Sequence, residues 1–174
     1  LCLLLKTNNW YICILAAVLT VLSKVLLRYK GRHFFNPSAF AIVVTILLTG
    51  QAWLSPAQWG SGTVIFFAVC CLGMIVVTRV QQLDLTLTFL ATFCGLLFVR
   101  QVLYLNWSAD VWLQSVSTGS LLLFSFFMIS DPRTAPDHPT VRLLWAAGIG
   151  MVAFYLSAFR FMNSTPLFVL VFAA

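Results

Sequence analysis

The chain has 174 residues, of which 61% are hydrophobic and only 8% are charged, and its mean hydropathy is +1.00. Soluble domains are roughly 45–50% apolar and about 25% charged, so this composition excludes a water-soluble globule and predicts an all-α integral membrane protein. A net charge of +6 would favour nucleic acid as the partner of a soluble protein, but here the cations lie between apolar runs, where they set membrane orientation. We therefore expect membrane lipids, and no nucleic acid, around this chain.

Four apolar runs are long enough, or nearly so, to cross a bilayer as helices, which takes about 20 residues. They are Trp10 to Leu27, Thr63 to Thr78, Leu85 to Leu105 and Leu143 to Ala158. A partial crossing begins near Met162, and both ends of the sequence lie in apolar segments without a polar tail. We expect residues 1–174 to form a single transmembrane domain that is a portion of a longer chain.

Two shorter segments lie between these runs, at Pro37 to Gly50 and at Thr118 to Ser130, with 14 and 13 residues. Each reaches only about 20 Å as a helix, which is less than the roughly 30 Å of the hydrocarbon core. The second could extend backwards through Trp107 to Val116, although Asp110 and the small polar residues that follow favour a kink there. The sequence thus predicts a polytopic bundle of roughly six or seven segments, some of them interrupted.

The distribution of cations predicts the orientation of the bundle. The loop from Lys24 to His33 falls on the same side as the loop from Asp131 to Arg142, and this side receives seven of the ten cationic residues. Because cytoplasmic loops carry an excess of Lys and Arg, we expect both loops in the cytoplasm and the protein in the inner membrane of a cell. Five of the six tryptophans lie on the other side, as an interfacial aromatic belt would.

The first of two motifs runs from Gly31 to Phe40 and contains Asn36-Pro37. Asn is a strong N-cap and Pro is preferred at the first helical position, so a helix is expected to begin sharply at Pro37. Free N–H groups at such an end suit a carbonyl, a phosphate or an anionic ring edge. The same two residues also suit the ordinary start of a membrane helix, but the shortness of this segment favours a binding role.

The second motif covers residues 118–136, and in it Asp131-Pro132 ends a helix and begins a turn. Asp131 can cap backbone amides there or pair with Arg133 or Arg142. An ordinary loop closed by Asp-Pro is the alternative. Two short segments marked by proline favour paired broken helices around a site within the membrane, as in many transporters.

Together the two motifs carry a family resemblance. Phe35 to Ser38, opening a short helix, and Ser125 to Pro136, with the order Phe-Phe-Met-x-x-Asp-Pro-x-Thr-x-Pro, resemble the RnfD/NqrB family. Its members are flavin-carrying membrane subunits of Rnf and sodium-pumping NADH:quinone oxidoreductase complexes. The resemblance implies a fold similar to that of urea transporters, in which interrupted helices surround a central site, and it implies other membrane subunits as partners.

One departure from the family pattern concerns the cofactor. Larger members attach FMN to a threonine in an Asp-x-x-(Ser/Thr)-Gly-Ala-Thr motif, and this sequence contains no such run. The resemblance therefore implies a non-covalent flavin, FMN or riboflavin, and does not support covalent FMN. The residues that would hold a cofactor are those at the two helix ends: Asn36, Pro37, Ser38, Ser130, Asp131, Arg133 and Thr134.

No catalytic or metal-ligating set is recognisable in the sequence, so the chain is at most an electron-transferring subunit of an oxidoreductase, since redox chemistry needs a cofactor. Two alternatives stay open. A small-solute channel of the urea-transporter type would use the same broken helices to line a pore. An accessory structural subunit would use its glycine-notched, aromatic faces to pack against a larger membrane complex.

A few positions within or beside the apolar runs give local expectations. Asp84 is expected to form a short polar turn with Arg79. Arg100 is expected to snorkel to the membrane interface or to face a buried anion. Gly148 and Gly150 predict a close contact between helices.

Overall fold

The computed structural model describes residues 4–29, 32–33, 36–55, 63–132, 135–136, 138–160 and 165–173. These residues form helices joined by short connections, with two small two-stranded sheets. The elements in chain order are β1 (Leu5–Thr7), α1 (Trp10–Leu26), β2 (Arg28–Tyr29), β3 (Arg32–His33), α2 (Pro37–Thr49), β4 (Ala52–Leu54), α3 (Thr63–Val80), α4 (Leu83–Phe98), η1 (Val99–Tyr104), α5 (Ala109–Val116), α6 (Gly119–Leu123), η2 (Phe124–Met128), α7 (Pro139–Arg160) and α8 (Thr165–Ala173), of which η1 and η2 are π-helical.

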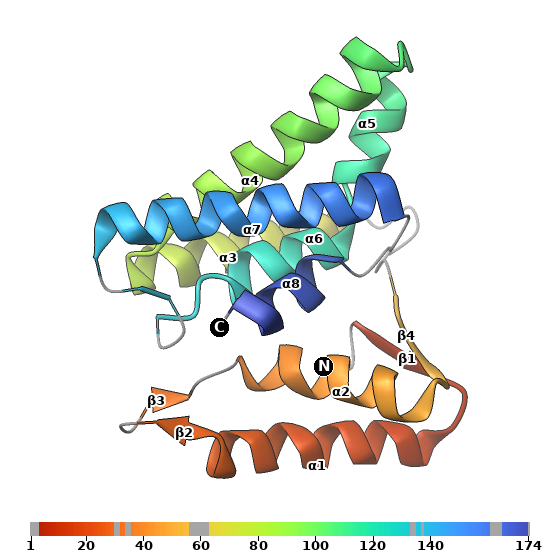
Figure 1. The fold of residues 1–174 in the computed structure, drawn as a ribbon, viewed down its shortest axis with the longest axis vertical. Coiled ribbons are helices and arrows are strands. Elements are labelled where there is room, and N and C mark those ends of the chain that lie inside the picture. Colours follow the sequence, from red (N-terminus) through yellow and green to blue (C-terminus); the bar gives the residue numbers. More distant parts are fainter. Residues whose placement is uncertain are drawn as a thin grey trace.

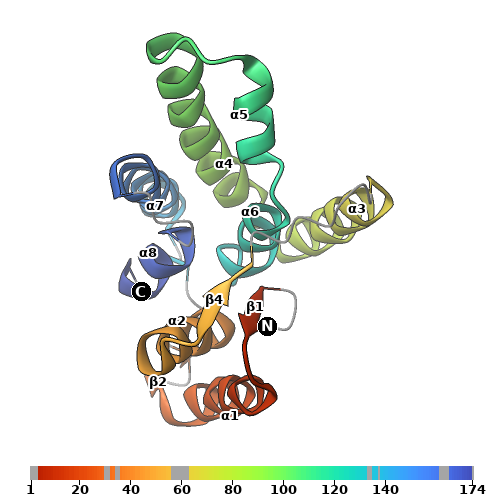
Figure 2. The same cartoon turned by 90° about the vertical axis from the view of Figure 1, so that its right-hand side faces the viewer.

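The helices α1 and α2 form a layer of their own beneath the rest of the fold (Figure 1). A hairpin of β2 and β3 joins them at one end, and at the other end β1 pairs antiparallel with β4. Seen from the side, α6 lies at the centre, with α3, the α4–α5 pair, the α7–α8 pair and the α1–α2 layer around it (Figure 2). This central position explains why Phe124 and Ser125, which follow α6 directly, are buried.

The sequence sets both ends of α2. Asn36 caps its start and Pro37 takes the first helical position, as the first motif predicts. At the other end Gly50 adopts a left-handed φ of 60° and its N–H bonds to the carbonyl of Ile46, which is the geometry that glycine permits most readily. The short helix is therefore a complete element with two caps and not the fragment of a longer one.

Two helices, α4 and α7, run in the same direction and meet in a constant register. Arg142 at the start of α7 binds Asp84 at the start of α4, and Arg100 near the end of the α4–η1 segment binds the carbonyl of Ala158. Both contacts join residues 58 apart in the chain. Midway, with the same offset, a Cβ placed on Gly150 would lie only 3.0 Å from the Cβ of Thr92. The close helix contact predicted for Gly150 is confirmed, whereas Gly148 faces open space.

Within the described residues, two helices are long and apolar enough to cross a membrane, Leu83–Tyr104 and Pro139–Phe159. A third crossing is complete if Ala109–Val116 and Gly119–Met128, which meet at an angle of 49°, count as one broken segment. The kink predicted before α6 is thus confirmed. The shorter apolar helices are Trp10–Leu26, Pro37–Thr49 and Phe67–Val80, so the chain is an all-α polytopic membrane protein, as its composition predicts.

Candidate functional site

Asn36 connects the two sequence motifs. Its Oδ1 accepts hydrogen bonds from the backbone N–H groups of Ser38 and Ala39, at 3.1 and 3.3 Å. Its Nδ2 donates to the carbonyl of Met128, at 3.4 Å, across 92 residues of chain. One buried amide therefore caps the start of α2 and the end of η2 together. We call this contact, with Ser130 beside it, the motif junction.

The end of η2 is closed by side chains from separate parts of the chain. A helix leaves its last carbonyls without partners inside the helix, and here Phe124 keeps a backbone partner in the N–H of Ile129, at 3.0 Å. The remaining contacts come from hydroxyl and amide groups, with Thr86 donating to Ser125 O, Ser130 donating to Phe126 O and Asn36 donating to Met128 O. Because each donor is buried or nearly so, the junction is held by satisfied polar groups within an apolar core.

The junction contains part of the residue set that the sequence assigned to a cofactor. Asn36 and Ser130 are buried, whereas Pro37, Ser38 and Asp131 are half-buried. Asn36 and the segment that carries Ser130 are brought together. Two further members of the set, Arg133 and Thr134, lie outside the described residues. The cofactor role of this set stays a prediction.

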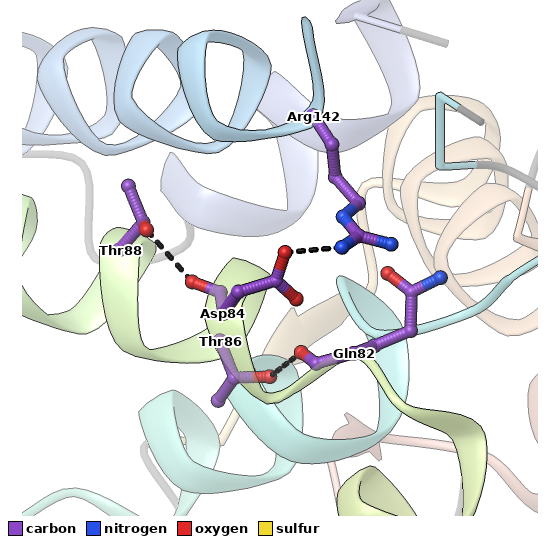
Figure 3. A network of polar contacts seen from close by, with 5 residues as sticks. All are labelled: Gln82, Asp84, Thr86, Thr88 and Arg142. Atoms are coloured by element: carbon purple, nitrogen blue, oxygen red, sulfur yellow. Dashed lines mark hydrogen bonds and ion pairs between the residues drawn. The ribbon is translucent and has the colours of Figure 1, made fainter. Parts of the chain in front are cut away.

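A polar cluster continues from the junction along the start of α4 (Figure 3). Arg142 donates to the Oδ2 of Asp84, and Thr88 donates to the Asp84 carbonyl at 2.7 Å. Thr86 lies between Asp84 and the junction, because its hydroxyl reaches both the Gln82 carbonyl and the Ser125 carbonyl. In the described part of the chain, some buried side-chain atoms of this cluster lack a hydrogen-bond partner, namely Gln82 Oε1, Asp84 Oδ1 and Arg142 Nε.

The ion pair of this cluster corrects a local expectation. Asp84 pairs with Arg142 on α7 and not with Arg79 at the end of α3. Arg142 is correspondingly committed to Asp84, so it is not the partner of Asp131. Sequence proximity suggested the wrong partner for Asp84, because the parallel packing of α4 and α7 brings together two first helical turns that are far apart in the chain.

A cavity of about 430 Å³ lies beside the break between α5 and α6. Its walls come from β4, α4, η1, α5, α6, η2, α7 and α8, and they include Phe93, Gln101, Thr118 and Thr165. This α5–α6 cavity reaches from Gln101 on η1 to Phe124 at the start of η2, so it extends towards the helix whose other end, at Met128, belongs to the motif junction. The sequence indicated the kink but not the cavity, because eight separate elements form the cavity.

Arg100 closes the end of α7 next to this region. Its Nη1 donates to the Ala158 carbonyl, and its guanidinium lies 4.6 Å from the centre of the Phe159 ring. Cations at a helix C-terminus are stabilised by the helix dipole and by the unpaired carbonyls there. The side chain thus serves a packing and capping role that neither expectation for it contained.

The fold and the two motifs define a polytopic helical membrane protein with broken helices. Residues 47–173 match the NQR2, RnfD, RnfE family, and the chain belongs to this family. It is accordingly a membrane subunit of the Rnf/Nqr type, which works within a multi-subunit complex. The matched range contains the second motif and begins after Asn36. No curated protein matches the chain.

Proposed function

We propose that this chain takes part in flavin-linked electron transport as an inner-membrane subunit, with a non-covalent flavin held beside the motif junction. The contact between Asn36 and Met128 carries the proposal, because it joins the two motifs on which the family resemblance rests. The orientation that we propose places the junction and the Asp84–Arg142 pair in the cytoplasmic half of the membrane, where most of the cations lie.

The chemistry of the cluster fits the edge of a flavin ring. An isoalloxazine ring carries an N–H donor between carbonyl acceptors. The unpartnered atoms in the cluster are of both kinds, with acceptors on Gln82 and Asp84 and a donor on Arg142. Buried polar atoms without partners are costly, so a ligand that pairs with them gains affinity at this place.

A bound flavin would supply the redox chemistry, and the residues of the chain would position it. Asn36, Thr86 and Ser130 hold the end of η2 in place through its carbonyls. Arg142, fixed by Asp84, would hold its guanidinium group beside a bound ring, where a cation can stabilise negative charge. Covalent attachment forms no part of this proposal, because the sequence has no matching threonine motif.

The test uses the complex purified in mild detergent from native membranes, with its neighbouring subunits. We expect visible flavin absorbance and, by mass analysis, a flavin that is released from this chain on denaturation. Asn36→Ser keeps the N-cap oxygen but is too short to reach Met128, and should lower the flavin content of this chain several-fold. Asn8→Ser is the matched control, because Asn8 is exposed and its side chain bonds to nothing in the described chain.

Two outcomes would contradict the proposal. One is a wild-type subunit that carries no flavin although the complex is intact. The other is an Asn36→Ser variant with unchanged flavin content, which would place the flavin away from the junction. Either result would favour an accessory structural role, in which the satisfied caps of Asn36 hold two broken helices together for packing alone.

A further inference from the structure

The α5–α6 cavity has an uncharged lining. Its walls consist of apolar side chains together with Ser, Thr and Gln, and they contain no acidic, basic or histidine side chain among the residues that the structure describes. A charged ligand would lose its hydration there without gaining a counter-charge, which disfavours its binding. A volume of about 430 Å³ is within the range of small-molecule sites. The cavity therefore suits a neutral ligand.

Hydroxyl groups in the lining lack hydrogen-bond partners. The four in question belong to Thr118, Ser120, Ser157 and Thr165, and none of them bonds to another group in the part of the chain that the structure describes. Elsewhere the helical hydroxyls of Thr88, Thr92 and Ser125 bond back to the carbonyl four residues earlier. Ser157 also lies within a helix, α7, but its hydroxyl does not bond to the carbonyl four residues earlier.

Thr165 gives the sharpest observation. Its relative exposure is only 1%, yet its side chain lines the cavity and its hydroxyl has no partner among the described residues. Buried polar groups in native proteins are nearly always hydrogen-bonded, to the protein or to a bound molecule. A molecule in the cavity that offers a hydrogen-bonding group would satisfy this hydroxyl.

Aromatic rings form one wall of the cavity. Phe93 and Phe124 line it, and Phe89 packs behind both, with ring centroids 5.8 Å from Phe93 and 5.1 Å from Phe124. Aromatic faces and edges favour contact with another flat ring. An acyl chain of a lipid would fill the volume but would leave the hydroxyl groups without partners.

We propose that the α5–α6 cavity is a binding site for a neutral aromatic ring that carries a hydroxyl group. The ring packs against Phe93 and Phe124, and its hydroxyl pairs with the Thr165 hydroxyl. The site uses other side chains than the motif junction, although η2 borders both, and it does not depend on the flavin proposed there.

The test measures binding of para-fluorophenol by fluorine NMR to the protein in nanodiscs, with empty nanodiscs subtracted to remove partition into lipid. Fluorobenzene provides the ring without the hydroxyl, and para-fluorobenzoate provides a charged ring. We expect saturable binding of the phenol, weaker binding of fluorobenzene and no binding of the benzoate.

Two variants assign the signal to the cavity. Thr165→Val keeps the shape of the side chain and removes its hydroxyl, and should weaken phenol binding about fivefold, the typical worth of one hydrogen bond. Ser157→Phe fills the volume and should abolish binding. Thr20→Val is the matched control, because the Thr20 hydroxyl bonds to Ala16 O on α1, away from the cavity.

The proposal is overturned if the phenol gives no saturable signal above empty nanodiscs, or if fluorobenzene binds as tightly as the phenol. It is also overturned if Ser157→Phe leaves binding intact, which would locate the phenol elsewhere, or if Thr165→Val binds like the wild type in a folded protein. Circular dichroism of both variants shows whether they are folded. Should Ser157→Phe not fold, Ser120→Phe fills the same cavity from α6 and decides the question.

Discussion

Asn36 serves two helices with one amide group, and this double use is what the two motifs have in common. The carbonyl oxygen of its side chain caps the beginning of α2, while the NH₂ group pairs with the last carbonyl of η2. A serine, threonine or aspartate at this position could also cap the beginning of α2. Only an amide of this length offers an acceptor and a donor at once, so the choice of asparagine follows from the second function.

Substitutions at Asn36 should therefore separate its two roles. Asn36→Ser keeps the N-cap and loses the bond to Met128, which we expect to lower the free energy of unfolding by about 1 kcal/mol. Asn36→Ala loses both, so the loss should rise to about 2 kcal/mol. Reversible unfolding in mixed micelles, followed by circular dichroism, measures both values. An Asn36→Ser variant as stable as the wild type would mean that the bond to Met128 contributes nothing, and equal losses for the two variants would mean the same of the N-cap.

At the scale of elements, the parallel pair of α4 and α7 determines much of the fold. Arg142 with Asp84 and Arg100 with Ala158 fix the pair at two levels that are 16 residues apart on each helix, which corresponds to about 24 Å. This length is most of the roughly 30 Å hydrocarbon core.

Gly150 allows α4 and α7 to approach between these two levels, and a pair of glycines on α7 tests this. Gly150→Leu places carbon atoms into Thr92 and the Phe89 carbonyl, and should destabilise the protein by about 2 kcal/mol. Gly148→Leu meets nothing within 4 Å and should change stability by less than about 0.5 kcal/mol. Unfolding titrations of both variants compare the two positions. A similar cost at both would show that α4 and α7 do not pack through Gly150.

The elements themselves could be predicted from the sequence because their signals are local. Runs of apolar residues, the Asn-Pro start at position 37 and the polar break before residue 119 placed helices and the kink close to where they lie. The π-helical η2 could not be predicted, since one of its carbonyls is paired with Thr86, which reaches across from another helix. The same holds for the candidate sites. The role of Asn36 as a cap could be predicted from the Asn-Pro pair. The unpartnered atoms of Gln82 and Asp84 and the cavity could not, because they result from packing between distant segments.

At the scale of the whole molecule, the register of α4 and α7 constrains topology. Because both helices start at the Asp84–Arg142 pair and run in the same direction, they cross the membrane in the same sense. The connection between them contains the broken α5–α6–η2 segment, which returns the chain to the starting side. Two helices that cross the membrane in the same sense need an odd number of crossings between them. The single broken crossing by α5–α6–η2 meets this requirement, whereas an even number would make α4 and α7 antiparallel.

This arrangement gives a testable orientation. In a variant without native cysteines, we expect Ser108→Cys, after the end of η1, to react with a membrane-impermeant maleimide added to spheroplasts. His138→Cys, just before α7, should react only after the membrane is opened, because the cation-rich side belongs in the cytoplasm. Both positions are exposed in the structure, so accessibility and not packing decides the result. Labelling of both from the same side would contradict a crossing by the α5–α6–η2 segment that lies between them. The reverse pattern would place the motif junction at the outer face and remove the cytoplasmic cofactor site.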